Sequence, residues 1–313
     1  MKLQQLRYLC EVANQGLSIS DAAIALHTSQ PGVSKQIRLL EEELGVEVLV
    51  RSGKRVVGLT EPGRAIVVVA ERVLREAANL KRVAEDYHQE DAGGFTIATT
   101  HTQARYSLPN VIKQFSERYP KVKLTLHQGN PGQIAAEVVS GRADLGIATE
   151  SLSDVAELTS LACYEWHHCL VTTPDHLLLK QRSISLFDIG RYPIITYDTA
   201  FAGRSKINRA FEQQGVTPNI ILSALDADVI KAYVALGLGI GIVAKMAFEP
   251  ARDTGLRMIK IDDLFPLNTT RIAFRRDGYL RRYVYDFIEL FAPHLTRDAV
   301  ERSRSGAADA YVI

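Results

Sequence analysis

Residues 16–50 read GLSISDAAIALHTSQPGVSKQIRLLEEELGVEVLV, and this stretch decides the fold of the first domain. It predicts two short amphipathic helices joined by a tight polar turn. Thr28 or Ser29 is the expected N-cap of the second helix, and Pro31 occupies its first turn. This arrangement is a candidate helix-turn-helix.

The second of these helices has two contrasting faces. Its apolar residues recur at the i, i+4, i+7 spacing of a buried stripe: Val33, Ile37, Leu40 and Leu44. The opposite face carries hydroxyl, amide and cationic groups: Gln30, Pro31, Ser34, Lys35 and Arg38. A short helix with such an outer face suits reading of the DNA major groove. The alternative is an ordinary helical hairpin whose outer face is simply solvated.

Next along the chain, residues 46–60 predict a short two-stranded wing with a basic tip. Arg51 and Lys54 near that tip are expected to contact DNA phosphates, the alternative being a solvated loop.

A long helix then runs from Thr60 to about Gln89. Its apolar residues keep an unbroken heptad register: Ile66, Ala70, Val73, Ala77, Leu80, Ala84 and Tyr87. This register favours a dimer, which would place two reading heads on one DNA site.

The first 60 residues also carry a family signature. The run A-A-x-x-L-x-x-S-Q-P-x-V-S-x-Q-I-x-x-L-E-x-x-L-G, from Ala22 to Gly45, resembles the winged helix-turn-helix of LysR-type transcriptional regulators. The resemblance continues through Arg51 and Leu59-Thr60-x-x-Gly63. It implies an α/β protein with an N-terminal winged helix-turn-helix, a long linker helix and a two-lobed effector domain like periplasmic binding proteins.

The expected domain boundaries follow from this organisation. The winged helix-turn-helix domain spans residues 1–59, with the helix-turn-helix at about 18–38, and the linker and dimerisation helix spans 60–89. The effector domain spans 90–313. Its lobe I is expected at about 93–162 and 269–293, and its lobe II at about 163–268.

Composition agrees with a soluble multidomain protein. The chain has 313 residues, 46% hydrophobic and 23% charged, with a formal net charge of +1. Near-neutrality argues against a uniformly basic surface but does not exclude DNA binding through arranged charges. Three cysteines give no disulfide framework, and we find neither a signal peptide nor a membrane-spanning run. We therefore expect a cytoplasmic protein without membrane contact.

Beyond a hinge at residues 90–94, strands and helices alternate, which predicts parallel-type sheets covered by helices. About 200 residues of this kind divide into two lobes with a cleft between them. The most informative stretch, Thr99-Thr100-His101-Thr102-Gln103, joins a strand to a helix, where open α/β sheets bind ligands. Hydroxyls, an amide and free backbone N–H groups there suit a small anion. The alternative is a threonine-rich N-cap.

The same stretch resembles a narrower group of the family, the CysB/Cbl regulators of sulfur assimilation and sulfonate utilisation. Matching motifs include residues 97–106, His127-Gln128-Gly129, Ala148-Thr149-Glu150, Gly203-Arg204-Ser205 and residues 226–241. The resemblance implies an effector site: Thr100, His101, Thr102, Gln103, Thr149, Trp166, Phe201 and Ala202. It implies sulfate, an acetylserine-type inducer or adenosine phosphosulfate as effector, with no cofactor. It further implies promoter DNA as partner, a homotetramer of paired dimers, and RNA polymerase as a candidate contact.

One position departs from the group. Members usually carry Thr before Gly-Arg-Ser, whereas this chain has Ala202, so one hydroxyl donor is missing. Asp198 or Thr199 on the same loop could substitute for it.

Three features favour a non-enzymatic protein without a metal site. On one strand Cys163 and His167 would be roughly 13 Å apart, too far to share a tetrahedral ion. Gly237-x-Gly239-x-Gly241 follows a helix, so it reads as a turn and not as a dinucleotide-binding loop. No nucleophile set stands in a recognisable context. The remaining alternative is a solute-binding or enzymatic α/β domain with an accessory helical head.

Overall fold

The computed structural model describes residues 1–53, 55–88 and 91–304, apart from the side chains of residues 85–88, 150, 151 and 202. The chain divides into two compact units, Met1–Glu85 and Asp86–Ile313, and each is described by itself. Among the described residues, no helix combines the length and the apolar character needed to cross a bilayer.

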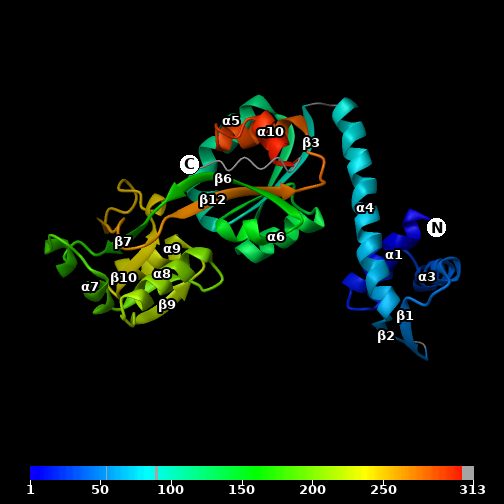
Figure 1. Ribbon diagram of the computed structural model, residues 1–313, viewed down its shortest axis with the longest axis horizontal. Coiled ribbons are helices and arrows are strands. Elements are labelled where there is room, and N and C mark those ends of the chain that lie inside the picture. Colours follow the sequence, from blue (N-terminus) through cyan, green and yellow to red (C-terminus); the bar gives the residue numbers. More distant parts are fainter. Residues whose placement is uncertain (54, 89–90, 305–313) are drawn as a thin grey trace. The chain divides into compact units, whose positions relative to one another are not determined.

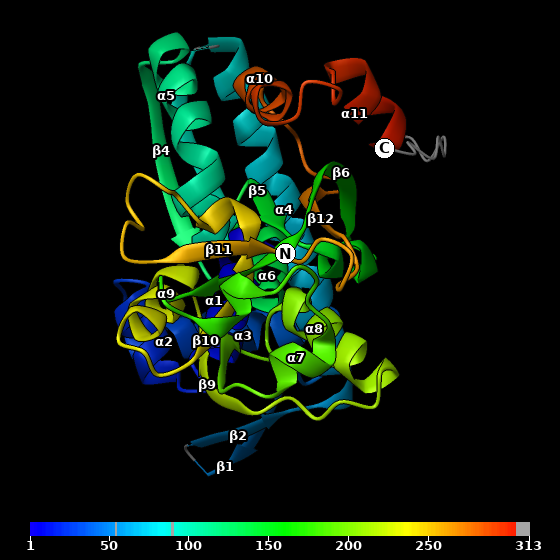
Figure 2. The same cartoon turned by 90° about the vertical axis from the view of Figure 1, so that its left-hand side faces the viewer.

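The first unit is a helical head followed by a hairpin and a long helix. Its elements are α1 (Leu3–Asn14), α2 (Ile19–Ala25), α3 (Gln30–Leu44), β1 (Leu49–Ser52), β2 (Arg55–Leu59) and α4 (Glu61–His88). The two strands pair antiparallel and form the predicted wing (Figure 2). One apolar core joins α1, α2, α3 and the first turns of α4, so the start of the linker helix belongs to the head.

Local chemistry sets the helix boundaries of the head. The Ser29 hydroxyl accepts a hydrogen bond from the Gly32 N–H at 3.3 Å, which caps α3, and Gly45 ends that helix in the left-handed conformation with φ 70°. The Thr60 hydroxyl accepts from the Gly63 N–H at 2.9 Å and caps α4. The predicted helix starts are therefore present.

The second unit contains two five-stranded sheets (Figure 1). In lobe I the strand order is β4-β3-β5-β12-β6, and in lobe II it is β11-β7-β10-β8-β9. The strands and helices of lobe I are β3 (Ala92–Thr99), α5 (Leu108–Arg118), β4 (Lys121–Gln128), α6 (Pro131–Ser140), β5 (Leu145–Ala148), β6 (Leu158–Trp166), β12 (Asn268–Arg275), α10 (Arg282–Phe291) and α11 (Arg297–Arg304). Helices α5 and α10 cover one face of this sheet and α6 covers the other.

Lobe II has the same layered plan. Its strands and helices are β7 (His168–Thr172), α7 (Leu186–Gly190), β8 (Ile194–Tyr197), α8 (Ala202–Gln213), β9 (Ile220–Ala224), α9 (Ala227–Ala235), β10 (Ile240–Ala244) and β11 (Arg257–Lys260). One apolar core lies on the α7 and α8 side of the sheet, and a second lies on the α9 side. The alternation of strands and helices therefore produced the two expected α/β lobes.

Several element predictions were wrong in detail. The expected single strand over residues 163–172 is two strands of different sheets, because the chain passes from lobe I to lobe II between Trp166 and His168. Residues 163–166 therefore lie in lobe I. The expected glycine hinge lies inside β3, where Gly93 has φ 137°. Near the C-terminal end of the described residues, α11 buries Ala299 and Val300, although residues 297–304 are mostly charged and polar.

The helix that follows the Thr99–Gln103 stretch is interrupted. Its first part, Gln103–Ser107, is a π-helical turn (η1), and α5 begins at Leu108. Pro109 lies at the start of α5, where a missing N–H costs no helical hydrogen bond. The wider turn of η1 is a local irregularity of the kind often found at functional sites.

Candidate DNA-binding face and effector pocket

Helix α3 presents the face that the sequence predicted. Val33, Ile37 and Leu40 are fully buried, whereas Gln30, Pro31, Lys35 and Arg38 are exposed and Ser34 is half-buried. Leu44 corrects the prediction of a longer buried stripe, because its side chain is 39% exposed. The helix therefore offers solvent an amide, a hydroxyl and two cations on one side.

Arg51, one of the predicted phosphate contacts, is paired within the head. Its guanidinium makes two hydrogen bonds to the Glu41 carboxylate, at 2.8 and 3.2 Å, and the same carboxylate accepts from the Val48 and Leu49 N–H groups. Burial raises the pKa of Glu41, but these hydrogen bonds lower it more, so the pKa is below its ordinary value. Arg51 thus ties the wing to α3. Lys54, the other predicted cation of the wing, lies outside the described residues.

The heptad positions of α4 divide between the head and solvent. Ala70 is 2% exposed and Ile66 and Val73 pack partly against the head core, whereas Leu80 is 73% exposed. An apolar groove of about 290 Å3 lies along this part of the helix: Met1, Leu6, Leu44, Ala65, Ile66, Val69, Ala70 and Val73. The exposure of Leu44 is explained by its place in this groove. The side chain of Tyr87 lies outside the described residues.

The two lobes enclose a small cavity at the predicted effector site. Its volume is about 40 Å3, and its lining comes from both lobes: Thr100, Thr102, Gln103, Thr149, Trp166, Tyr197, Phe201, Gly203 and Ala244. Six of the eight predicted effector residues therefore line one pocket. We call this cavity the effector pocket.

Two of the three threonine hydroxyls of the effector pocket are without a protein partner among the described residues. Among the described residues, neither the Thr100 nor the Thr149 hydroxyl is engaged by another side chain or by backbone, and Thr102 is hydrogen-bonded to Tyr197. Burial raises the pKa of Tyr197 well above its usual range, so the phenol stays protonated. The donors available to a ligand are therefore neutral at physiological pH.

Gln103 lines the effector pocket, but its amide is already committed. Nε2 donates to the Thr270 hydroxyl at 3.0 Å, and Oε1 accepts from the Tyr164 hydroxyl. Trp166 Nε1 donates to the same Thr270 hydroxyl at 3.2 Å. Gln103 is 2% exposed, so we interpret it as a group that holds the pocket wall and not as a free donor.

His101 faces away from the effector pocket, which corrects the prediction that it contacts the effector. Its Nε2 lies 3.1 Å from Asp228 Oδ2 on α9, and its Nδ1 lies 3.1 Å from Gln128 Oε1. The backbone is helical at His101 and Thr102, so successive side chains point in different directions around the helix axis and His101 reaches α9 while Thr102 lines the pocket.

The contact of His101 with Asp228 is part of a network that joins the lobes, and we call His101, Tyr106, Asp228 and Lys231 the inter-lobe latch. Tyr106 donates to Asp228 Oδ1, and Lys231 Nζ lies 3.5 Å from the same oxygen. His101, Asp226 and Asp228 also place three potential metal ligands within 4.8 Å of one another. The hydroxyl and cationic partners already neutralise Asp228, so we assign this cluster to lobe contact and not to a metal.

The latch changes the pKa of His101 in a definite direction. Burial lowers that pKa, but the hydrogen bonds to Asp228 and Gln128 and the nearby Asp226 raise it by more, so it lies above its ordinary value. The sequence singled out His101 but could not reveal its partner, because Asp228 is 127 residues away.

Lobe II contributes walls more than donors. Tyr197 and Phe201 present aromatic rings, and Gly203 contributes backbone near the start of α8. The side chain of Ala202 lies outside the described residues. Neither suggested substitute lines the pocket: Thr199 is exposed, and the Asp198 carboxylate accepts the Ala200 N–H at 2.9 Å. The sequence analysis did not identify Tyr197 as a site residue. The available signal was its position, because Tyr197 is the last residue of β8 just as Thr99 is the last residue of β3.

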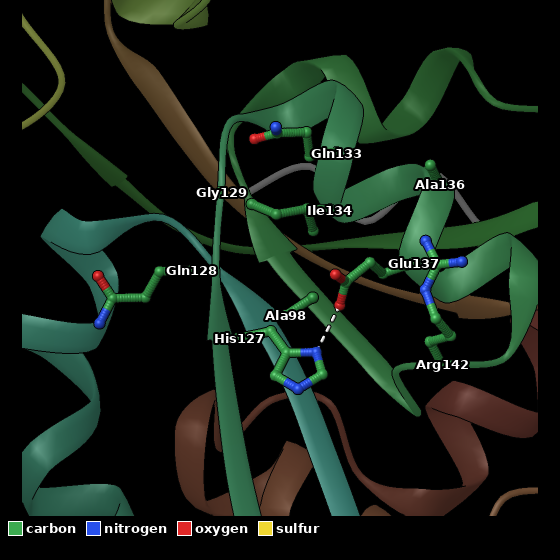
Figure 3. Close-up of a pocket in the computed structure, with 9 residues that line it drawn as sticks. All are labelled: Ala98, His127, Gln128, Gly129, Gln133, Ile134, Ala136, Glu137 and Arg142. Carbon is green, nitrogen blue, oxygen red and sulfur yellow. Dashed lines mark hydrogen bonds and ion pairs between the residues drawn. The ribbon is translucent and has the colours of Figure 1, made fainter. Parts of the chain in front are cut away.

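A second, larger cavity of about 290 Å3 lies entirely on lobe I, between β4 and α6 (Figure 3). His127 Nδ1 and Glu137 Oε2 are 2.7 Å apart across it, and Arg142 lies at its rim. A ligand there would touch one lobe only, so it would not favour a particular arrangement of the two lobes. The effector pocket is therefore the stronger candidate for a sensing site.

The cysteines have the character of structural residues. Cys163 in β6 and Cys169 in β7 are buried thiols of different sheets, and burial raises the pKa of each to about 12. A buried thiol with such a pKa stays protonated at neutral pH and is a poor nucleophile. Gly237, with φ 77°, leads out of α9, as expected for a turn and not for a dinucleotide-binding loop.

Taken with the two-lobed unit, the winged helix-turn-helix defines a class of ligand-responsive DNA-binding proteins. Two family models match the chain: "Bacterial regulatory helix-turn-helix protein, lysR family" over residues 3–64 and "LysR substrate binding domain" over residues 88–296. The second match alone covers more than half of the chain. This chain belongs to the LysR family of transcriptional regulators, so the predicted family and fold class are confirmed.

Individual relatives are similar over nearly the full length. The regulator CysB of Burkholderia cenocepacia is 53% identical over 311 residues, which is 99% of both chains. The regulator SsuR of the same organism is 51% identical over 295 residues, 94% of this chain and 96% of that one. The crystal structure of the cofactor-binding domain of the Cbl regulator matches with TM-score 0.65 and 44% identity, over 67% of this chain and 92% of that one. These relatives are regulators, in agreement with the predicted non-enzymatic role.

Proposed function

We propose that this chain is a cytoplasmic regulator of sulfur assimilation or sulfonate utilisation genes, controlled by a small sulfur-containing anion. The observation that carries this proposal is that Thr100, Thr102 and Thr149 come together in one small pocket lined by both lobes. Similarity to CysB, SsuR and Cbl supports the assignment to sulfur metabolism.

The size of the effector pocket favours the smallest of the candidate effectors. Its volume of about 40 Å3 corresponds to about three waters, at roughly 10–15 Å3 for each. A tetrahedral oxyanion such as sulfate fits a space of this order. An acetylserine would require the lobes to separate slightly, and adenosine phosphosulfate would require them to open widely. We therefore propose sulfate or a small sulfur oxyanion as the ligand of this closed arrangement.

Neutral donors suit a sensor of this kind. Hydroxyl groups hold an anion without a full counter-charge, so each bond contributes only about 0.5–1.5 kcal/mol and release stays easy. The pocket is built from both lobes, so its occupant favours the arrangement in which they are close. An effector must bind the two states of its protein differently in order to switch them.

At the promoter, we propose that Gln30 and Ser34 reach base edges while Lys35, Arg38 and Lys54 contact phosphates. Arg51 is left out of this set because it is paired with Glu41.

A second copy of the chain could bury the groove along α4 and the exposed Leu80, which would form a dimer. Two such dimers would then pair to form the tetramer. A contact with RNA polymerase would follow from promoter binding.

The test is a gel-shift titration of the full chain with promoter DNA upstream of sulfur genes and with a scrambled sequence, each with and without sulfate. We expect preferential promoter binding that sulfate changes. Gln30→Ala should reduce the preference, because a good base contact contributes about 1–3 kcal/mol to discrimination. Lys35→Ala is the matched control and should weaken binding to both DNAs alike. Equal binding of the two DNAs by the unchanged chain would refute the proposal.

A further inference from the structure

Thr270 is a fully buried threonine that contacts the wall of the effector pocket from within lobe I. It lies in β12 and is 0% exposed. Its hydroxyl oxygen accepts two hydrogen bonds, from Gln103 Nε2 at 3.0 Å and from Trp166 Nε1 at 3.2 Å. Gln103 and Trp166 both line the effector pocket, whereas Thr270 does not. One buried oxygen therefore connects two parts of the pocket wall that are distant in the sequence.

The hydrogen bond from Trp166 has only one possible direction. An indole N–H donates and cannot accept, so the Thr270 hydroxyl is its acceptor whatever the direction of the other bonds that this hydroxyl makes. Among the described residues, the indole N–H has no other acceptor. The Trp166 ring also packs edge-on against the ring of His168 in lobe II, with centroids 5.2 Å apart. The hydrogen bond to Thr270 is thus the only polar contact among the described residues that fixes this indole.

A β-bulge in β6 accompanies this arrangement. Thr270 faces Tyr164 across the pair of β12 and β6, and the register shifts directly beyond that position, which makes Cys163 an extra residue of β6. A bulge bends its strand and re-aims the side chains beside it, and bulges are common next to functional sites. Tyr164 donates to Gln103 Oε1, so Tyr164 and Trp166 both join the network around Thr270. We call Gln103, Tyr164, Trp166 and Thr270 the wall clamp.

We propose that Thr270 is a positioning residue that fixes the indole of Trp166 and thereby limits the effector pocket to small oxyanions. This inference rests on the proposed function of the effector pocket. The pocket encloses only about 40 Å3, and Trp166 has the largest side chain in its lining. A fixed indole keeps the pocket near the size of sulfate. An indole that could turn away would admit a larger ligand and would hold a small one less closely.

A threonine hydroxyl is well suited to this role. The branched β-carbon of threonine restricts rotation about χ1, so its oxygen stays in one place relative to the strand. Because Thr270 is 0% exposed, solvent does not compete for that oxygen. Without it, the donors of Gln103 and Trp166 would both lose their buried acceptor, and a buried donor that lacks an acceptor is unfavourable.

The test is calorimetry of the full chain with two sulfur oxyanions of different size, sodium sulfate and sodium benzenesulfonate. Thr270→Val keeps the shape of the side chain and removes the acceptor. We expect sulfate to bind about tenfold more weakly, the scale of one hydrogen bond, and benzenesulfonate to bind as well as before or better. The ratio of the two affinities is the decisive readout, because a purely structural residue would leave that ratio unchanged.

Two further variants control this measurement. Thr270→Ser keeps the hydroxyl and should restore the affinity ratio of the unchanged chain. Thr172→Val is the matched control, since Thr172 is another threonine that is 0% exposed, its hydroxyl donates to the Thr173 carbonyl at 3.1 Å, and it lies outside the pocket lining. This variant should keep the affinity ratio even if its unfolding temperature falls. An equal change of the ratio in Thr172→Val would contradict a specific role of Thr270.

Intrinsic fluorescence observes the wall clamp directly, because Trp166 is the single tryptophan of the chain. In the unchanged chain the indole should move only with the whole protein, so its anisotropy decay should lack a fast component. Thr270→Val should introduce a fast component, and Thr270→Ser should not. A fast component of equal size in the unchanged chain would refute the inference, because the indole would then not be fixed.

The outcomes separate this inference from the proposed function. If Thr100→Ala abolishes sulfate binding and Thr270→Val leaves the affinity ratio unchanged, the effector pocket stands and the role of Thr270 is refuted. If neither substitution affects sulfate binding, both proposals fail.

A second modification covers the case in which Thr270→Val does not fold. Trp166 is then replaced by benzothienylalanine, which has nearly the shape of tryptophan and carries sulfur in place of the indole N–H. An unchanged affinity ratio in that protein refutes the inference. A tenfold shift of the ratio toward benzenesulfonate supports it.

Discussion

The two lobes of the effector domain repeat one local design. In lobe I the Thr99 hydroxyl at the end of β3 donates to the Ile147 carbonyl of β5, and in lobe II the Thr196 hydroxyl of β8 donates to the Ile242 carbonyl of β10, both at 3.0 Å. Each lobe also places a helix over a glycine of the neighbouring strand. The β3–β5 pair of lobe I and the β8–β10 pair of lobe II therefore carry the same threonine contact near their C-terminal ends.

What differs is the residue that follows each threonine. Lobe I continues with Thr100 and then Thr102, which turn hydroxyls into the effector pocket. Lobe II continues with Tyr197, whose hydroxyl accepts from the Ala244 N–H at 3.0 Å, and with the ring of Phe201. One lobe supplies most of the donors and the other supplies most of the walls.

The largest expected effect concerns the shared design. A methyl group at Gly146 would lie 2.9 Å from Val138 Cγ2, and one at Gly241 would lie 2.9 Å from Val234 Cγ2. Each Gly→Ala substitution should lower the free energy of unfolding by about 1–3 kcal/mol, because the helix must move off its sheet. Chemical denaturation measures both. Gly255→Ala is the control, since nothing lies within 4 Å of its added methyl group. A loss in one lobe alone would refute the equivalence.

A pH-dependent effect should follow from the latch. The pKa of His101 is raised in the folded protein. The pairing of His101 with Asp228 therefore contributes its full stabilisation below the unfolded pKa of about 6.5. This stabilisation is lost as the pH rises through the higher folded pKa. The thermal unfolding midpoint, followed from pH 5.5 to pH 9, should contain a component that falls with rising pH. His101→Gln should remove that component. An unchanged pH profile in this variant would show that the latch does not hold the lobes together.

The opposite sign is expected at His176 in lobe II, which serves as an internal control. Burial lowers the pKa of His176, so its contribution to stability is present above the unfolded value of about 6.5 and is lost as pH falls through the lower folded value. His176→Gln should therefore flatten the profile on the acid side only. If both variants altered the same part of the profile, the assignment of the two slopes would be wrong.

The smallest expected effect tests the departure at residue 202. Ala202→Thr would add a hydroxyl donor to lobe II, at the start of α8. Sulfate affinity, measured by calorimetry, should rise by up to about tenfold, which corresponds to one hydrogen bond of about 0.5–1.5 kcal/mol. Unchanged or weaker binding would indicate that the hydroxyl at this position cannot reach the anion.

Patterns of local origin were predictable from the sequence. The caps at Ser29 and Thr60, the buried stripe of α3 and the strand-to-turn position of Thr100 depend on neighbouring residues, and the structure shows them at the expected places. The alternation of strands and helices likewise predicted both lobes. Such features are set by spacing and by backbone chemistry within one or two elements.

Features that depend on distant partners were not predictable. Three predicted site residues turned out to have partners that are distant in the sequence. Arg51 is paired with Glu41, His101 with Asp228, and Gln103 with Thr270. The point where the chain changes lobes, at His167, also lacks a local signal, because no glycine or proline separates the two strands within residues 163–172. Side-chain direction and pairing are set by tertiary packing, which a single sequence does not encode in its spacing.

The central claim is that the threonine hydroxyls of lobe I bind a tetrahedral anion between the lobes. The most direct measurement is anomalous diffraction from crystals grown with selenate, whose selenium scatters strongly and whose shape matches sulfate. We predict one dominant selenium peak inside the effector pocket, with selenate oxygens within hydrogen-bond distance of Thr100 and Thr149. A dominant peak elsewhere, such as the His127 and Arg142 cavity, or an empty pocket at saturating selenate, would contradict the account.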